Sequence, residues 1–172
     1  FYKSNFKNTN LKIQNSNCED SLNLVRSKGT INKIEISNSF SDGLDIDFSS
    51  LYIHDIFIKD SKNDCVDVSA GTYEVGNMKV SSCGDKGLSV GEKSILKLDN
   101  IFVQNSEIGI ASKDGSKSFV NKFNGKNVDI CLSSYNKKQE FSGGQIKVNK
   151  YSCTDFNKKN FIDNQSKINL NN

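Results

Sequence analysis

The stretch from Ser41 to Val68, SDGLDIDFSSLYIHDIFIKDSKNDCVDV, contains the same short pattern twice, 22 residues apart. Each copy alternates apolar residues with an aspartate, first as Leu44-Asp45-Ile46 and then as Val66-Asp67-Val68. Strict alternation over a short run indicates a β-strand with one buried face. A fixed period of this length is typical of a solenoid, in which each turn packs on its neighbours.

The pattern continues in both directions at the same spacing. Six segments align without gaps and have apolar third positions; with 35% apolar residues, chance would give roughly two such columns in a thousand. The position before that column is small in every segment, which indicates a tight corner or close packing. The apolar column reads Leu22, Leu44, Val66, Leu88, Ile110 and Leu132, and the small column reads Ser21, Gly43, Cys65, Gly87, Gly109 and Cys131.

Two further apolar columns fall within each period. Three strands in 22 residues leave room for tight corners but for no crossover helix. We therefore predict an all-β fold, a right-handed parallel β-helix solenoid of about six coils of 22 residues with three short strands per coil. The first of these columns holds Ile34, Ile56 and Met78, and the second holds Leu51, Tyr73 and Ile95.

The chain has 23 asparagines and no proline. Asparagine tolerates the left-handed backbone conformation of tight turns. We therefore expect a corner at which small polar side chains hydrogen-bond from coil to coil. The corresponding column reads Asn17, Ser39, Ser61, Cys83, Asn105 and Asn127.

The repeat becomes irregular after about residue 140, beyond the charged segment Tyr135–Glu140. We place a single β-helix domain at residues 1–156 and a polar C-terminal cap or tail at residues 157–172. The first residues contain neither an initiator Met nor a signal-peptide pattern, so we expect a larger parent chain. No apolar run reaches the roughly 20 residues of a membrane-spanning helix. A net charge of +3 without a Lys/Arg block argues against a nucleic-acid partner.

Four consecutive coils, residues 38–115, resemble the polygalacturonases, glycoside hydrolases that cut pectin and belong to the pectin lyase-like β-helix family. Ser41–Ile46 (SDGLDI) is similar to their NTDGIDI segment, and Asn63–Val68 (NDCVDV) is similar to the DDC segment of the next coil. Cys83–Gly91 (CGDKGLSVG) is similar to their CGxGHGISIG, and Gly109–Lys113 lies where they carry GVRIK. The resemblance implies the same fold and a polysaccharide partner.

The chemistry that this resemblance implies needs one protonated carboxylic acid and carboxylates that hold the attacking water. Asp42 and Asp64 match two of the three acids, and Lys113 matches one of the basic residues.

Three family positions are changed. Asn63 replaces the implied general acid, and an amide has no titratable proton to donate. Lys86 stands in place of the family's His, and Ala111 in place of the Arg that would bind a uronate carboxylate. We therefore expect no intact glycosidase chemistry.

Asp45, Asp47 and Asp67 fall on one exposed face, because the apolar residues between them must point inward. Glu92 and Asp114 lie beside this face at the strand ends. Stacked like charges about 5 Å apart repel by about 1 kcal/mol even in water. One interpretation is a ligand face, or a Ca²⁺ site at Asp45, Asp47 and Asp67, with no other cofactor required. The other is a solvated acidic surface that keeps the sheet from pairing with other sheets.

The five cysteines lack C-x-x-C spacing, which disfavours a zinc site. Cys131 and Cys153 are one repeat apart, so a 22-residue register that survives the charged loop would bring them within disulfide reach. His54 is the only histidine and has no partner motif, so we expect a structural role.

These observations favour an extracellular or cell-surface module that faces carbohydrate and binds or displays it without intact glycosidase chemistry. One alternative is a polysaccharide hydrolase or lyase that uses Asp45, Asp47, Asp67 and Lys113, which a groove flanked by ordered loops would favour. A second alternative is a structural spacer or adhesion stalk, which a flat face with few loops would favour. The absence of tryptophan weakens the glycan interpretation.

Overall fold

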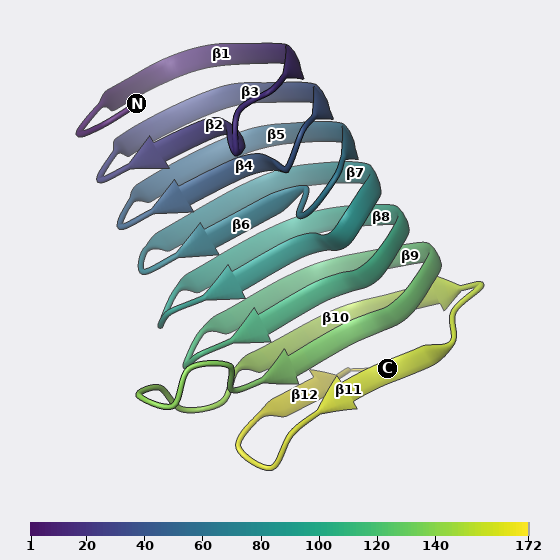
Figure 1. Ribbon diagram of the computed structural model, residues 1–172. Coiled ribbons are helices and arrows are strands. Elements are labelled where there is room, and N and C mark those ends of the chain that lie inside the picture. Colours follow the sequence, from purple (N-terminus) through teal and green to yellow (C-terminus); the bar gives the residue numbers. More distant parts are fainter. Residues whose placement is uncertain (172) are drawn as a thin grey trace.

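The computed structural model describes residues 1–171, and within them the chain consists of parallel β-strands joined by corners and loops (Figure 1). No helix in this range is long and apolar enough to cross a membrane. The strands are β1 (Asn5–Ser16), β2 (Asp20–Val25), β3 (Lys28–Ser39), β4 (Asp42–Asp47), β5 (Ser50–Ser61), β6 (Val66–Ser69), β7 (Thr72–Gly91), β8 (Ile95–Lys113), β9 (Lys117–Tyr135), β10 (Gln145–Thr154), β11 (Lys158–Ile162) and β12 (Lys167–Leu170).

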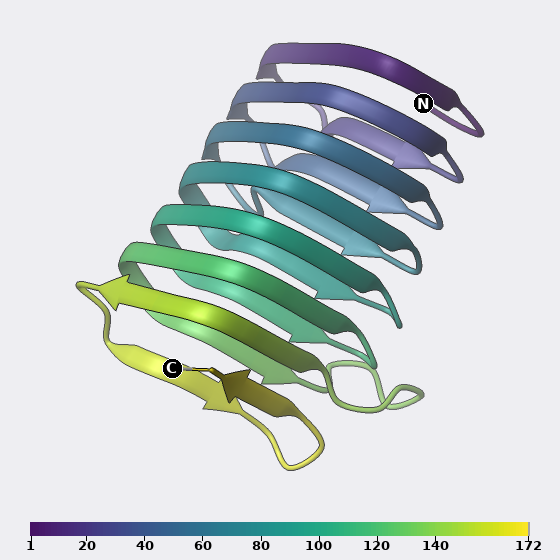
Figure 2. The ribbon, with the colours of Figure 1, turned by 180° about the vertical axis from the view of Figure 1, so that it is seen from behind.

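The strands stack in register as a solenoid, which confirms the predicted fold. The long strands follow the order β1-β3-β5-β7-β8-β9-β10-β12, so the solenoid has about eight turns and not six. The short strands β2, β4 and β6 form a second layer that continues through the C-terminal parts of β7, β8 and β9 and ends with β11. The view from behind shows both layers (Figure 2).

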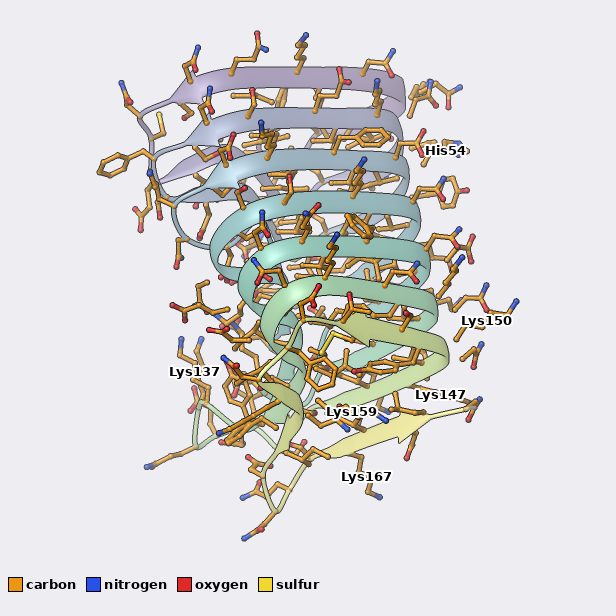
Figure 3. The ribbon with its side chains drawn as sticks, turned by 90° about the vertical axis from the view of Figure 1, so that its right-hand side faces the viewer. His54, Lys137, Lys147, Lys150, Lys159 and Lys167 are labelled. Carbon is orange, nitrogen blue, oxygen red and sulfur yellow. A yellow bond between two sulfur atoms is a disulfide. The ribbon has the colours of Figure 1, made fainter. Side chains whose placement is uncertain are left out.

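Two of the three expected strands of a coil are joined into one bent strand. In β5 the pairs Leu51/Ile53 and Ile56/Ile58 both point inward, and His54 and Asp55 lie at the bend between them. His54 is exposed on the outside of the solenoid, where its ring packs edge-on against Tyr52 (Figure 3). The two residues at the bend shift the alternation, so that the apolar pairs before and after it both point inward while the strand continues.

The apolar column that defines the repeat forms one buried stack. Its six members are paired from coil to coil. Each is between 0% and 6% exposed. This stack confirms the central prediction of the sequence pattern.

The small column owes its size to the opposite wall of the solenoid and to the backbone of the next coil, whose Cys131 carbonyl oxygen would lie 2.5 Å from a Cβ at Gly109. A Cβ added at Gly87 would lie 2.5 Å from Cγ1 of Val103, and one at Gly109 would lie 3.0 Å from Cζ of Phe123. Where the column carries cysteine, the sulfur bonds to the next coil. The structure contains the disulfides Cys65–Cys83 and Cys131–Cys153 and an exposed free thiol at Cys18.

The structure contains the Cys131–Cys153 bond, but the 22-residue register on which its prediction is conditional does not continue across the loop. Cys153 is in register with Gly125, 28 residues earlier, because the loop between β9 and β10 adds six residues to this coil. The disulfide forms because Cys131 occupies the small column, which faces the neighbouring wall across the corner. Cys65–Cys83 arises at the same column, and the sequence analysis missed it.

Two coil-to-coil steps span 23 residues, from β1 to β3 and from β7 to β8, and they correct two of the expected columns. Tyr73 pairs with Leu96, so Leu96 is buried and Ile95 is 40% exposed. The extra residue of the later step lies at the corner between β7 and β8, and the register is restored between Cys83 and Lys86.

The polar corner is displaced by one residue for the same reason. Asn105 and Asn127 align with Asn38 and Asn15, and not with Ser39. All four asparagines have positive φ. Asn38 donates to Asn15 Oδ1 at 2.8 Å, and Asn127 donates to Asn105 Oδ1 at 2.8 Å.

The segment expected as a polar cap or tail adds two short strands to the end of the solenoid. β11 pairs with β9, and β12 pairs with β10. Ile168 and Leu170 are partly buried and pack against the core. The segment therefore covers the last coil with a few apolar side chains, and its exterior is mixed, because Phe161 and Ile162 are each 46% exposed.

Candidate functional site

The short-strand face is the outward surface of β2, β4 and β6 and of the C-terminal parts of β7, β8 and β9. Two columns of residues point outward there, because the residues between them form the core. The first column is Asn23, Asp45, Asp67, Ser89, Ala111 and Ser133, and the second is Val25, Asp47, Ser69, Gly91, Lys113 and Tyr135.

The structure brings Asp45, Asp47 and Asp67 together in the N-terminal half of this face. Asp45 and Asp67 are register partners on β4 and β6, and Asp47 lies two residues further along β4. All three are half-buried. Asn23, on the preceding coil, donates a hydrogen bond of 2.8 Å to Oδ2 of Asp45.

The crowding of carboxyl groups changes their protonation. Burial, together with the negative charges of Asp47, Asp20 and Asp67, raises the pKa of Asp45 to about 8. Burial also raises the pKa of Asp47, against the opposing effect of its hydrogen bond with Asp45. Asp45 is therefore largely protonated at neutral pH.

Lys113 borders this acidic region on the side of the later coils. Its Nζ lies 3.6 Å from Oδ2 of Asp67, although the two residues are separated by two coils. The lysine stem crosses Gly91, where an added Cβ would come within 3.0 Å of Cε of Lys113. Glycine at position 91 therefore leaves room for the stem that carries the ammonium group to Asp67.

The positions that match the polygalacturonase acids hold adjacent coils together. Oδ1 of Asp42 accepts the backbone N–H of Asp64 at 2.8 Å and the side-chain amide of Asn63 at 2.7 Å. Oδ1 of Asp64 accepts the backbone N–H of Lys86 at 3.0 Å and its ammonium group at 3.3 Å. These carboxylate oxygens are engaged within the solenoid.

Asp64 is buried, and this burial raises its pKa to about 6 despite the opposing charge of Lys86. Lys86 also pairs with Asp85 and is itself almost buried. The lysine that stands in place of the family's histidine thus forms part of a closed ion-pair cluster.

Glu92 and Asp114 anchor the long loop between β9 and β10. Oδ1 of Asp114 accepts the backbone N–H groups of Lys137 and Lys138 at 2.7 and 2.8 Å, and Glu92 pairs with the ammonium group of Lys138. Asp114 is fully buried. Only Glu92 acts electrostatically on the acidic region, because its charge contributes to the raised pKa of Asp47.

The C-terminal half of the short-strand face is closed. Ser89, Ala111 and Ser133 belong to its outward column, yet they are 0–1% exposed. Lys113, which lies beside them, is 8% exposed. Accessible carboxylates are therefore concentrated on β4 and β6, and we call Asp42, Asp45, Asp47 and Asp67 the acidic face.

Within residues 1–171, no group of three or more His, Cys, Asp or Glu side chains is arranged to hold a metal ion. Asp45, Asp47 and Asp67 offer the oxygen ligands that Ca²⁺ prefers. The calcium site stays a prediction.

Two exposed aromatic residues flank the acidic face, and the sequence analysis missed them. Phe40 precedes β4 and is 66% exposed, and Phe48 follows it and is 55% exposed. Phe48 has a φ of 51°, which is uncommon for a bulky side chain, and Arg26 lies over its ring at 5.6 Å. The sequence could have predicted their exposure, because both lie just outside a strand of alternating apolar residues.

No family model, curated protein or solved structure matches the chain in the comparisons with known proteins.

Proposed function

We propose that this chain is an extracellular or cell-surface β-solenoid module that binds carbohydrate at the acidic face and does not cleave it by polygalacturonase chemistry. The observation that carries this proposal is the pairing of half-buried carboxyl groups at Asp45, Asp47 and Asp67 with exposed rings at Phe40 and Phe48. Carboxyl oxygens accept hydrogen bonds from hydroxyl and ammonium groups, and exposed rings supply flat apolar area.

The two disulfides support the extracellular address. Disulfides persist in oxidising environments and are rare in proteins of the reducing cytosol. Cys65, Cys83 and Cys131 are nearly or fully buried, and each bond joins successive coils.

The negative charge of the acidic face favours some classes of sugar ligand over others. The carboxylates of Asp42, Asp47 and Asp67 would repel the carboxylates of a uronate polymer, and Asp45, which is largely protonated at neutral pH, offers them no positive charge. Neutral sugars can donate their hydroxyl groups to these oxygens, and amino sugars can also form charge-assisted hydrogen bonds. The proposed ligand is therefore a neutral or amino-sugar glycan.

Calorimetric titration with glucosamine oligomers, N-acetylglucosamine oligomers and polygalacturonate tests this proposal. We expect glucosamine oligomers to bind best and polygalacturonate not to bind to this face. The double variant Asp45→Asn/Asp67→Asn should weaken binding of glucosamine oligomers by tenfold or more, because it removes the carboxyl group of Asp45 and, at Asp67, a charge-assisted hydrogen bond of about 1.5–3 kcal/mol.

Glu107→Gln/Glu140→Gln is the matched control, because it likewise converts two carboxyl groups to amides, on exposed residues elsewhere. It should leave binding unchanged. An equal loss in both double variants, or no binding of either amino-sugar oligomer to the wild-type chain, would refute the proposal.

A second candidate function is an enzyme that uses the acidic face in another way. Asp45, with a pKa of about 8, could serve as a general acid beside the Lys113–Asp67 ion pair. Release of reducing ends or of unsaturated products from neutral polysaccharides, abolished by Asp45→Asn, would support this function. We expect neither product, and we also expect no hydrolysis of polygalacturonate, because Asn63 cannot act as the acid.

A further inference from the structure

A second face, on the long strands of the last coils, is basic. Lys97, Phe119 and Lys147 are register partners on β8, β9 and β10 and point outward side by side. Lys117 and Lys167 lie in the adjacent outward column, two residues before them along the strands. Lys122 and Lys150 are partners at the bend.

Each of these lysines is exposed. Figure 3 labels Lys147, Lys150 and Lys167 on the outside of the last coils. We call the basic face Lys97, Lys117, Phe119, Lys122, Lys147, Lys150 and Lys167.

The charge of this face is concentrated. β9 from Lys117 to Lys126, β10 and β12 contain no Asp or Glu. The carboxylates beside the face are Glu74, which pairs with Lys97 at 2.8 Å, and Asp99. Six lysines against two carboxylates exceed the net charge of +3 of the entire chain. The rest of the chain is on balance slightly negative, so the positive charge belongs to this face.

Protection of a sheet edge does not explain all of these lysines. Lysines on an edge strand discourage pairing with other sheets, and that reason suffices for Lys167 on β12. β9 is an interior strand, paired with β8 on one side and with β10 on the other. Lys117 and Lys122 lie on this interior strand, where neighbouring like charges are destabilising, so they need another reason. Lys150 lies beyond the β10–β12 pairing, which ends at Val148, so edge protection also applies to it.

Phe119 gives the basic face a site for a ring. It is 43% exposed between Lys97 and Lys147. A shallow groove of 240 Å³ beside it is lined by these three residues and by the amides of Asn121 and Asn149. The groove thus combines an apolar ring, two ammonium groups and two amides that can hydrogen-bond to hydroxyl groups.

The lysines are spread over roughly 14 Å across the strands and 17 Å along them, from the spacing and rise of β-strands. This area suits a ligand with repeated negative charges better than a single anion. The disulfides favour an extracellular ligand, and a polysaccharide fits that address better than a nucleic acid.

We propose that the basic face binds an anionic polysaccharide, with a sugar ring on Phe119 and sulfate or carboxylate groups on the surrounding lysines. This site is separate from the acidic face and independent of the function proposed for it. A chain with both sites could hold two glycans of opposite charge on different sides of one solenoid.

Three forms of one polymer, matched in length, test the proposal: dextran, carboxymethyl dextran and dextran sulfate. Titration of the wild-type chain should show binding of one or both charged forms and no binding of dextran. The comparison of the two charged forms identifies carboxylate or sulfate as the preferred group. Affinity should fall as NaCl is raised from 50 to 200 mM, because exposed charges are screened.

The variant Lys117→Gln/Lys147→Gln/Lys150→Gln should weaken binding by tenfold or more. The matched control, Lys12→Gln/Lys59→Gln/Lys79→Gln, removes the same charge from three exposed lysines on earlier coils and should change affinity less than threefold. Phe119→Ala keeps the charge and should still weaken binding by about fivefold or more, by analogy with base stacking on aromatic side chains. Thermal unfolding should be nearly unchanged in all three, because the substituted side chains are exposed.

Several results would overturn the proposal. An equal loss in the control variant would show a general effect of charge. Binding of uncharged dextran would show that the face does not require anionic groups on its ligand. Single-stranded DNA that binds more tightly than dextran sulfate, and depends on Phe119, would identify a nucleic-acid site. A dimer in sedimentation that the basic variant dissociates would identify a second copy of the chain as the occupant. Asp45→Asn/Asp67→Asn should leave dextran sulfate binding intact, so the two proposed sites can fail separately.

Discussion

The acidic face on β4 and β6 and the basic face on β8, β9, β10 and β12 are built on the same solenoid and differ in nearly every outward residue. Behind the acidic face, Ile46 and Val68 are 1–2% exposed, and behind the basic face Val120 and Val148 are equally buried. Strand alternation separates the two sets of positions, so packing constrains the inward residues and leaves the outward ones free. Ligand chemistry in this chain must therefore be sought in outward columns, coil by coil.

The largest expected effect is a loss of stability from a substitution in the core that supports both faces. Leu88 is 0% exposed in the middle of the apolar stack. Leu88→Ala should lower the free energy of unfolding by about 2–5 kcal/mol, because it removes buried area and leaves a cavity. Chemical denaturation measures this change. Lys147→Ala, on the outward side, should stay within about 0.5 kcal/mol, and a comparable loss there would contradict the division into inward and outward columns.

A smaller effect should distinguish the faces by pH. The pKa of Asp45 is raised from about 3.9 in an unfolded chain to about 8 in the folded protein. Between these values the folded state holds a proton that the unfolded state has lost, so stability falls as pH rises from about 4 to about 8. Asp64, with a pKa of about 6, acts in the same direction up to that pH. Thermal unfolding should therefore occur a few degrees higher at pH 5 than at pH 8.

Asp45→Asn should flatten this profile between pH 6 and pH 8, because an amide does not titrate. Lys147→Gln, on the basic face, should leave the profile unchanged. A melting temperature that rises over this range, or a profile insensitive to Asp45→Asn, would mean that the acidic face is more hydrated than the structure indicates.

Calcium should have the smallest effect. If Asp45, Asp47 and Asp67 hold Ca²⁺, a concentration several-fold above the Kd should stabilise the chain by about 1 kcal/mol through mass action. That corresponds to roughly 2–4 °C in a chain of this size. Asp45→Asn/Asp67→Asn should abolish the gain, whereas the basic-face variant should retain it. A flat calorimetric titration of the wild-type chain would remove the calcium site.

The sequence predicted the features that depend on alternation and a constant period. Leu22 through Leu132 could be assigned to one stack because one apolar residue recurs every 22 positions. Asp45 and Asp67 could be placed side by side because they are one repeat apart. Both point outward because the apolar residues on either side of them in the strand point inward.

Corner insertions limited the prediction elsewhere. An extra residue near Glu92 and Lys93 moved Leu96 inward and Ile95 outward, and a compensating change before Lys86 restored the register. The short-strand pattern therefore showed no sign of the insertion.

The basic face could not be predicted from the sequence for a related reason. Lys117 and Phe119 become neighbours of Gln145 and Lys147 only through a 28-residue step, set by the long loop that Asp114 and Glu92 anchor. In the sequence these lysines are scattered and form no block. The burial of the outward column at Ser89 and Ala111 is also not revealed by periodicity.

Mapping of backbone amide shifts by NMR, with two ligands on one labelled sample, tests most directly the claim that the two faces bind separately. Glucosamine oligomers should shift the amides of Asp45, Asp47 and Asp67 and leave those of Phe119 and Lys147 unchanged. Dextran sulfate should do the reverse, and each ligand should still bind when the other is saturating. Shifts at one shared set of residues with both ligands, or none at the acidic face with glucosamine oligomers, would contradict the account.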